Sequence, residues 1–350
     1  MFDITSLENS EHTFVIAEAG SNWKCGNFED DLKQAQKLID IAIESGADAV
    51  KFQTFKSKST YVENAGEINY LKSKTKDIGK LFDELSMPYE MLKELSSYCV
   101  KKNIHFMSTP FSVKDAKEVD QYVELHKVSS FEINHIGLLK YLSDCNKPII
   151  ISTGASSYSE IDFALDILKK QRSSLALLQC TSKYPAEFDS MNISAIPKIK
   201  EKYKLPVGLS DHSIDPLVAP LLAIGMGATI IEKHFTIDKT LEGADHFFSL
   251  NPSELKIMIS AIRNADNSKG DGIKEILSEE NELWKFAKRR VHAITDISSG
   301  DIFREGINID LLRSGHQKLG AEPKFLSSIS GKKSKRSIQT GEGVTLEDIE

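Results

Sequence analysis

The sequence lacks several features that would place it in a special class of protein. It contains only four cysteines, with no C-x-x-C pair among them, so reduced thiols are expected rather than a disulfide framework. No apolar run reaches the about 18 residues that a membrane helix requires. Residues 1–4 do not begin a basic region followed by an apolar core, as a signal peptide would. These absences predict a cytoplasmic protein that does not associate with membranes.

An excess of positive charge is also missing. The net charge is −7, from 44 basic and 51 acidic residues, and only residues 332–336 (KKSKR) are locally basic. A nucleic-acid-binding protein usually has a basic balance or a basic stripe, so nucleic acid is not expected as a partner. The charged fraction of 27% and the hydrophobic fraction of 40% are typical of a globular protein.

Strand-like and helical patterns alternate through the first 270 residues. No G-x-G-x-x-G motif follows the first strand-like run, which argues against a dinucleotide-binding fold. Eight strand-helix repeats within about 255 residues predict an α/β fold, specifically a (β/α)8 TIM barrel. The strand-like runs are 13–19, 49–55, 104–109, 125–130, 148–153, 175–181, 206–210 and 229–235. Helical patterns include 32–43, 87–102, 113–122, 158–170, 193–203, 215–226 and 253–266.

One connection is unusually long. Residues 56–86 are polar and rich in Lys, Ser and Asn, and they separate the second strand-like run from the next helical pattern. Loops longer than about 15 residues are usually functional or mobile. This segment is therefore a candidate lid over the mouth of the barrel, with an inert insertion as the alternative.

The alternation stops after residue 270. We predict a barrel domain over 1–270, a linker over 271–287 and a small β-rich domain over 288–350. Residues 297–301 (ISSGD) are echoed by 338–342 (IQTGE), 41 residues later. The two matching glycine turns predict that the small domain is pseudo-symmetric.

Polar residues follow one another at the predicted carboxyl ends of the strands. Active sites of (β/α)8 barrels lie at this end, so the series predicts one shared site. The residues are Glu18, Lys51, Gln53, Ser108, Thr109, Lys127, Ser130, Glu132, Ser152, Thr153, Thr181, Ser182, Tyr184, Ser210, Asp211, His212, Glu232 and His234.

Two histidines in this series stand at matching positions on neighbouring strands. Side chains alternate across a strand, so Ser210 and His212 share one face, as do Glu232 and His234. If that face points inward, His212 and His234 approach each other, and two imidazoles suit a divalent transition metal. Glu18 is the candidate carboxylate ligand. A lone histidine would more often be a buried structural residue.

Two lysines lie within predicted buried strands. Lys51 and Lys127 would be costly there unless an anion meets them. With Thr109, Ser130 and Ser152 they would form a cradle for phosphate or carboxylate. Formation of a Schiff base by one of the lysines and a structural ion pair with a strand-end glutamate remain alternatives.

Short motifs at these strand ends resemble those of the sialic acid synthase family, in order and spacing over nearly the whole chain. Residues from about 288 onward resemble the antifreeze-like (SAF) domain of the family. The motifs are residues 17–22 (AEAGSN), 50–54 (VKFQT), 108–111 (STPF), 152–154 (STG), 180–185 (CTSKYP), 208–213 (GLSDHS) and 231–235 (IEKHF).

This resemblance implies a transferase that condenses phosphoenolpyruvate with an N-acetylated hexosamine aldehyde. The products would be a nine-carbon 2-keto sugar acid and phosphate. It also implies a domain-swapped homodimer, in which Arg313 reaches the N-acetyl group of the sugar bound by the partner subunit. His212 and His234 would hold a divalent metal, typically Mn²⁺, with Mg²⁺ or Co²⁺ as alternatives.

The other site residues fall into two groups by the same resemblance. Positions that match phosphoenolpyruvate contacts are Lys51, Thr109, Lys127, Ser130, Ser152 and Ser210. Positions around the sugar and the reacting carbons are Glu18, Gln53, Tyr184 and Asp245, with Glu132 and Ser182 as further candidates for substrate binding. Glu18 is the candidate for moving a proton or stabilising the developing cation.

The departures from the family pattern lie on the sugar side. Residues 22–24 read Asn-Trp-Lys, Ser182 replaces a common asparagine, residues 129–132 read Ser-Ser-Phe-Glu, and Arg313 is followed by Ser-Gly. The acceptor is therefore either N-acetylmannosamine or a 6-deoxy-diacetamido hexose. A Schiff-base pyruvate aldolase and a non-catalytic polysaccharide-binding protein are the alternative functions.

Overall fold

The computed structural model describes residues 3–4, 7, 12–67 and 75–350. Residues 68–74, which belong to the candidate lid, lie outside the described residues. The chain divides into two compact units, Met1–Gly270 and Asp271–Glu350, which are described separately below. Within the described ranges, no helix is both long enough and apolar enough to cross a bilayer.

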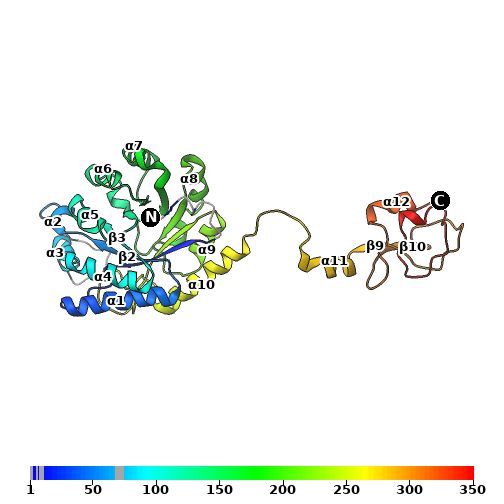
Figure 1. The fold of residues 1–350 in the computed structure, drawn as a ribbon, viewed down its shortest axis with the longest axis horizontal. Coiled ribbons are helices and arrows are strands. Elements are labelled where there is room, and N and C mark those ends of the chain that lie inside the picture. The colour runs from blue at the N-terminus through cyan, green and yellow to red at the C-terminus, as the bar shows by residue number, and fades with distance from the viewer. Residues whose placement is uncertain (1–2, 5–6, 8–11, 68–74) are drawn as a thin grey trace. The chain divides into compact units, whose positions relative to one another are not determined.

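The first unit alternates strands and helices, with the helices arranged around the strands (Figure 1). Its strands are β1 (Phe14–Gly20), β2 (Ala49–Thr54), β3 (His105–Pro110), β4 (His126–Val128), β5 (Ile149–Ser152), β6 (Leu175–Cys180), β7 (Val207–Asp211) and β8 (Ile230–His234). Its helices are α1 (Phe28–Ser45), α2 (Ser57–Thr60), α3 (Ile78–Glu84), α4 (Tyr89–Lys102), α5 (Val113–Asp120), α6 (Ile136–Asp144), α7 (Tyr158–Ile167), α8 (Ala195–Tyr203), α9 (Val218–Gly225) and α10 (Pro252–Ser268).

The eight strands form one parallel sheet in the order β3-β2-β1-β8-β7-β6-β5-β4. Its two edge strands, β3 and β4, lie next to each other, so the sheet curls into a nearly closed barrel. The predicted (β/α)8 fold is confirmed. All eight strands overlap the predicted strand-like runs, because each run is short, apolar and bounded by polar or glycine positions.

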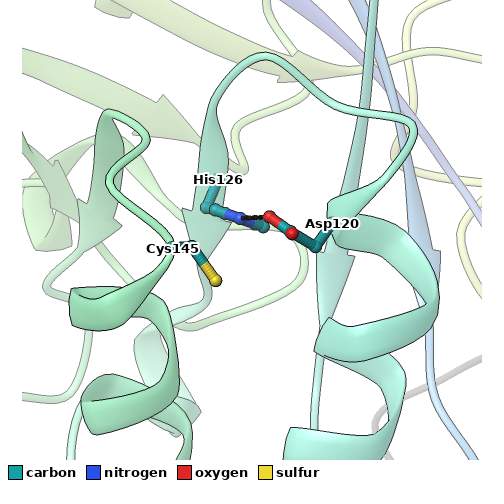
Figure 2. A group of neighbouring side chains, drawn as sticks. All are labelled: Asp120, His126 and Cys145. Carbon is teal, nitrogen blue, oxygen red and sulfur yellow. Dashed lines mark hydrogen bonds and ion pairs between the residues drawn. The ribbon is translucent and has the colours of Figure 1, made fainter.

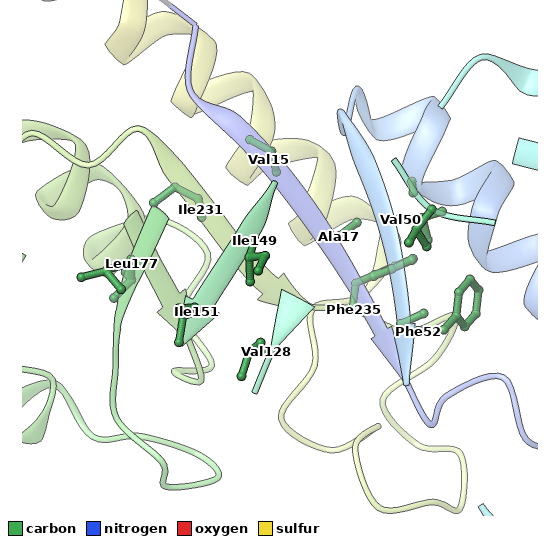
Figure 3. Close-up of a cluster of buried hydrophobic side chains, with 14 of the residues drawn as sticks. Val15, Ala17, Val50, Phe52, Val128, Ile149, Ile151, Leu177, Ile231 and Phe235 are labelled. Atoms are coloured by element: carbon green, nitrogen blue, oxygen red, sulfur yellow. The ribbon is translucent and has the colours of Figure 1, made fainter. Parts of the chain in front are cut away.

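The alternation of side chains along each strand separates two parts of the core. Val15 and Ala17 of β1 face outward and join the large cluster between the strands and the helices (Figure 3). Phe14 and Ile16 belong to a second cluster that fills the interior of the barrel. The next residue on the interior face is Glu18, where the barrel interior changes from apolar to polar.

The segment between β2 and α4 contains two short helices that the sequence pattern did not predict, α2 and α3. Its two ends are joined at the barrel rim, because Lys56 Nζ donates to Ser86 Oγ at 2.8 Å and to the Met87 carbonyl at 2.9 Å. Ser86 Oγ in turn donates to the carbonyl of Phe55 at 2.8 Å. The described part of this segment is therefore attached to the rim at its base.

The second unit contains α11 (Asn281–Ala287), the antiparallel strands β9 (Arg289–Ala293) and β10 (Ile309–Arg313), and α12 (Leu326–Ile329). The two echoed segments pair with each other: Ile297 and Ile338 exchange two backbone hydrogen bonds of 2.9 Å. Gly300 N donates to Ser334 O, and Gly341 N to Ala293 O, which are equivalent bonds under the 41-residue offset. The repeat thus forms a pseudo-twofold core. Its assignment as an SAF domain stays a prediction.

Candidate active site

A cavity of about 390 Å³ opens at the carboxyl ends of the barrel strands. It has the size of a small-molecule site. Of the residues predicted to bind substrate or metal or to act in catalysis, all line this cavity except Ser182 and Arg313. Four others of the polar strand-end series do not line it: Ser108, Thr153, Thr181 and Asp211. The predicted residues that line it are Glu18, Lys51, Gln53, Thr109, Lys127, Ser130, Glu132, Ser152, Tyr184, Ser210, His212, His234 and Asp245.

Glu18 and Lys51 form a buried ion pair on adjacent strands. Lys51 Nζ lies 2.6 Å from Glu18 Oε2 and donates to Thr109 Oγ1 at 2.9 Å. Gln53 Nε2 donates to Glu18 Oε1 at 3.0 Å, so both carboxylate oxygens of Glu18 have partners. Burial raises the pKa of Glu18 to about 7, although Lys51 opposes the shift. Burial also opposes the charge on Lys51, but Glu18 and Glu232 outweigh it and raise the Lys51 pKa.

The second buried lysine comes from β4, two strands around the barrel from Lys51 of β2. Lys127 Nζ donates to Ser152 Oγ at 2.6 Å and to the Val128 carbonyl at 3.0 Å. Burial lowers the pKa of Lys127, and Glu232 only partly offsets this effect. Glu232 Oε1 lies between the lysines, 3.8 Å from Lys51 Nζ and 3.9 Å from Lys127 Nζ. The site therefore has two ammonium groups that line one cavity and share the carboxylate of Glu232.

The two predicted metal ligands lie side by side. The ring centroids of His212 and His234 are 5.6 Å apart. His212 Nδ1 is 2.8 Å from the Thr181 carbonyl, which fixes the proton on Nδ1 and leaves Nε2 as an electron-pair donor. His234 Nδ1 is buried without a hydrogen-bond partner, and burial together with His212 holds the pKa of His234 well below its usual value.

These residues fit a divalent metal. Two neighbouring imidazoles offer nitrogen ligands, and Glu232 Oε2, a buried carboxylate oxygen without a hydrogen-bond partner, offers an oxygen ligand from the strand of His234. The carboxylate suggested by the sequence, Glu18, is already bonded to Lys51 and Gln53. Glu232 is therefore the better candidate for the carboxylate of the set.

Asp245 is positioned by the loop after β1. Its Oδ2 accepts from Ser21 N at 3.0 Å and from Ser21 Oγ at 2.8 Å. Gly20 permits this approach, because its φ is +53° and a Cβ there would lie 2.6 Å from Asp245 Oδ2. Tyr184 completes this side, with its ring centroid 4.2 Å from that of His212.

Among the described residues, neither Glu132 nor Ser182 bonds to a lysine or histidine of the site, and Arg313 belongs to the second unit. Glu132 lines the cavity and contacts Ser129, and burial raises its pKa to about 8. Ser182 does not line the cavity, but its Oγ is buried beside Gly154 without a partner. Arg313 is an exposed residue of β10 in the second unit, and its predicted role in the partner subunit's site stays a prediction.

Several lining residues were given no role from the sequence. Glu232 belongs to the predicted polar strand-end series and shares a strand face with His234, but it was not assigned as a ligand or catalytic residue. An aromatic wall, which we define as Phe55, Tyr61, Phe82 and Phe111, had no such signal. Its rings come from four separate places in the chain and meet only through the fold of α2 and α3.

A different group of residues lies at the amino end of β4. Asp120, His126 and Cys145 place one ligand atom each within 4.8 Å of the others, so they could hold a metal ion (Figure 2). In the structure one polar atom of each residue already has a partner, although His126 Nδ1 is buried without one. His126 Nε2 is 2.8 Å from Asp120 Oδ1, Lys147 Nζ is 3.0 Å from the same oxygen, and Cys145 Sγ donates to a backbone carbonyl.

Comparison with known proteins identifies the family to which this chain belongs. The profile of the NeuB family matches residues 38–274. The chain is 40% identical to the N,N'-diacetyllegionaminic acid synthase of Campylobacter jejuni, over 84% of this chain and 88% of the relative. It is 37% identical to the spore coat polysaccharide biosynthesis protein SpsE of Bacillus subtilis, over 96% and 93% of the two chains.

A solved structure agrees with these sequence matches. The N-acetylneuraminic acid synthetase of Leptospira borgpetersenii superposes with a TM-score of 0.69 at 36% identity, covering 78% of this chain and 90% of that one.

Proposed function

The chain belongs to the NeuB family, and we propose that it is a nonulosonic acid synthase. It condenses phosphoenolpyruvate with the open-chain aldehyde of an acetamido hexose, releasing a nine-carbon 2-keto acid and phosphate. The observation that carries this proposal is the pair of buried lysines, Lys51 and Lys127, that face one cavity beside His212 and His234. A substrate with both a phosphate and a carboxylate matches two separate ammonium groups.

The lysines bind and orient phosphoenolpyruvate in the proposed reaction. Lys127 with Ser152, and Lys51 with Thr109, hold the anionic groups by charge-assisted hydrogen bonds. This orientation points the enol carbon at the aldehyde, which lies toward Asp245 and Tyr184. When bound at His212 and His234, a divalent metal supplies Lewis-acid polarisation of the aldehyde.

The bond changes balance with one water molecule. The C3 carbon of phosphoenolpyruvate forms a bond to the aldehyde carbon, and positive charge develops at C2. The C=O π pair moves to the aldehyde oxygen, which gains a proton and becomes a hydroxyl. Water adds to C2 and loses a proton, and the tetrahedral intermediate then breaks its C–O bond to release phosphate. Glu18, with a pKa raised to about 7, is suited to accept that proton near neutral pH and to stabilise the cation.

A Schiff-base aldolase is the alternative enzyme. Its lysine must be neutral to attack a carbonyl, whereas the ion pair with Glu18 favours the charged form of Lys51. Lys127, whose pKa is lowered, is the candidate left for this chemistry. Borohydride treatment in the presence of pyruvate distinguishes the two: the synthase leaves the mass of the chain unchanged, and an aldolase gains the mass of the reduced pyruvate adduct.

We also propose that the active form is a homodimer in which Arg313 completes the site of the partner. The support is the resemblance to the family, together with the exposed position of Arg313 on β10. Arg313→Ala and His212→Ala homodimers should each be inactive. Mixing them under conditions of subunit exchange should restore activity, because one site of the mixed dimer would be intact. Failure of exchanged subunits to regain activity would contradict the shared site.

The proposed function is tested by phosphate release from phosphoenolpyruvate with a panel of acetamido hexoses. We expect release that requires both the sugar and a divalent metal such as Mn²⁺, and that stops on addition of chelator. Absence of release with every sugar, with metal present, would overturn the synthase assignment.

A further inference from the structure

The cavity has two chemically different walls. One carries the lysines, the serines and the histidines discussed above. The other consists of the aromatic wall, Phe55, Tyr61, Phe82 and Phe111, extended by Leu81 and Leu85. In the proposed reaction phosphoenolpyruvate and the sugar aldehyde would lie along the first wall, which leaves the second wall for the rest of the acceptor sugar.

The aromatic wall is a connected surface. The ring centroids of Phe55 and Phe82 are 4.6 Å apart, those of Phe55 and Phe111 are 5.1 Å apart, and Tyr61 meets Phe82 edge-on at 4.9 Å. Such tilted and edge-to-face pairs are the favourable arrangements of aromatic rings. The wall is therefore packed against itself and presents a defined hydrocarbon surface to the cavity.

The wall is also held in place at its base. Lys56 bonds to Ser86 and to the backbone beside it, and Ser57 Oγ donates to Asp83 Oδ1 of α3. These bonds fix α2 and α3, which carry or adjoin Tyr61 and Phe82, against the rim of the barrel. A surface held in this way can select among ligands by shape.

We propose that the aromatic wall selects acceptor sugars by a methyl group. Phe82 is only half-buried and Tyr61 is 39% exposed, so both leave apolar surface facing the cavity. A methyl covers this surface favourably, whereas a hydroxyl placed there would lose its hydrogen bonds to water. All acetamido hexoses share the acetyl methyl of the 2-acetamido group, so a selective methyl has two sources: C6 of a 6-deoxy sugar, or the acetyl group of a second acetamido substituent. Acceptors with either of these additional methyl groups are called methyl-bearing below.

This inference rests on the proposed function and is tested with four acceptors. They are N-acetylmannosamine and its 6-deoxy, 4-acetamido-4-deoxy and 6-deoxy-4-acetamido derivatives. We expect the wild-type enzyme to favour methyl-bearing acceptors by about 10- to 100-fold in kcat/KM, the range for one small group in an apolar pocket. A preference that follows the 6-deoxy change assigns the wall to C6, and one that follows the 4-acetamido change assigns it to the acetyl methyl.

Substitution of Phe82 distinguishes a role in acceptor selection from a role in stabilising the fold. Phe82→Asn should reduce the preference at least about 5-fold by lowering kcat/KM for the methyl-bearing acceptors alone, and Phe82→Leu should retain most of it. Phe163→Asn is the matched control, because Phe163 of α7 is 46% exposed and does not line the cavity.

The outcomes are distinct. Equal use of all four acceptors by the wild type, or an equal loss with all four in Phe82→Asn, would overturn the inference and leave the synthase assignment intact. No phosphate release with any acceptor would overturn the synthase assignment itself.

Discussion

Both ends of the barrel bury a histidine near acidic and basic groups, yet only one end is built for chemistry. At the carboxyl ends, His234 Nδ1 and Glu232 Oε2 lack hydrogen-bond partners and face or adjoin an open cavity. At the amino end, His126 Nδ1 also lacks a partner, but His126 Nε2 is bonded to Asp120, which also pairs with Lys147, and none of these residues lines the cavity. The presence of ligand-type residues is therefore less informative than whether they face an open cavity.

The largest expected effect separates the two histidine sites. His212→Ala should lower turnover by at least about 100-fold and weaken Mn²⁺ binding, because it removes one of two imidazole ligands. Cys145→Ser, at the amino-end group, should change neither. Mn²⁺ binding followed by electron paramagnetic resonance, together with phosphate release, measures both variants. An active, metal-independent His212→Ala enzyme would refute the ligand assignment.

The next effect compares two lysines. Lys127→Met should raise the KM for phosphoenolpyruvate about 10- to 100-fold, since a hydrogen bond to a charged group is worth about 1.5–3 kcal/mol. Lys147→Met should leave this KM unchanged, because Lys147 pairs with Asp120 at the other end of the barrel. Steady-state kinetics at fixed sugar concentration provides the comparison. Equal KM values for the two variants would remove Lys127 from the anion site.

The smallest effect is a contrast in the pH dependence of stability. Burial raises the pKa of Glu132 from 4.5 to about 8, so the folded state keeps this proton longer than the unfolded state. Its contribution to the free energy of unfolding is full below pH 4.5 and is lost as the pH rises to about 8, at up to about 1.4 kcal/mol per pH unit. Glu132→Gln should therefore flatten the fall in Tm between pH 5 and pH 8.

Asp120 should behave in the opposite sense. Burial alone would raise its pKa, but the hydrogen bonds from Lys147 and His126 outweigh burial and lower it. Its contribution is present above pH 3.8 and is lost in acid, so Asp120→Asn should lower Tm at neutral pH and converge with the wild type as the pH falls toward 3. If Tm changed with pH in the same way in the wild type and in both variants, the pKa shifts assigned to Glu132 and Asp120 would be contradicted.

The sequence predicts the fold and much of the cavity because both follow from strand periodicity. Alternation along β7 and β8 predicts that His212 and His234 share an inward face, and the structure brings their rings to 5.6 Å. The same rule places Glu232 on that face of β8, beside His234, but does not give it a role. A single pattern thus accounts for most of the polar lining.

Other features depend on tertiary packing that no local pattern encodes. The helices α2 and α3 are too short to produce a clear apolar period, so the aromatic wall could not be predicted. Asp120, His126 and Cys145 likewise come from the end of α5, the start of β4 and the residue after α6. The echo in the second unit was visible in sequence, but the direct pairing of its copies through Ile297 and Ile338 was not.

The central claim is that the cavity condenses phosphoenolpyruvate with a sugar by breaking the C–O bond to phosphate. It is tested most directly with phosphoenolpyruvate carrying ¹⁸O at the bridging oxygen, an acetamido hexose and Mn²⁺. The account predicts that the label leaves entirely in inorganic phosphate, because water supplies the keto oxygen of the product. Label retained in the keto acid would mean that the P–O bond breaks, and would contradict the account.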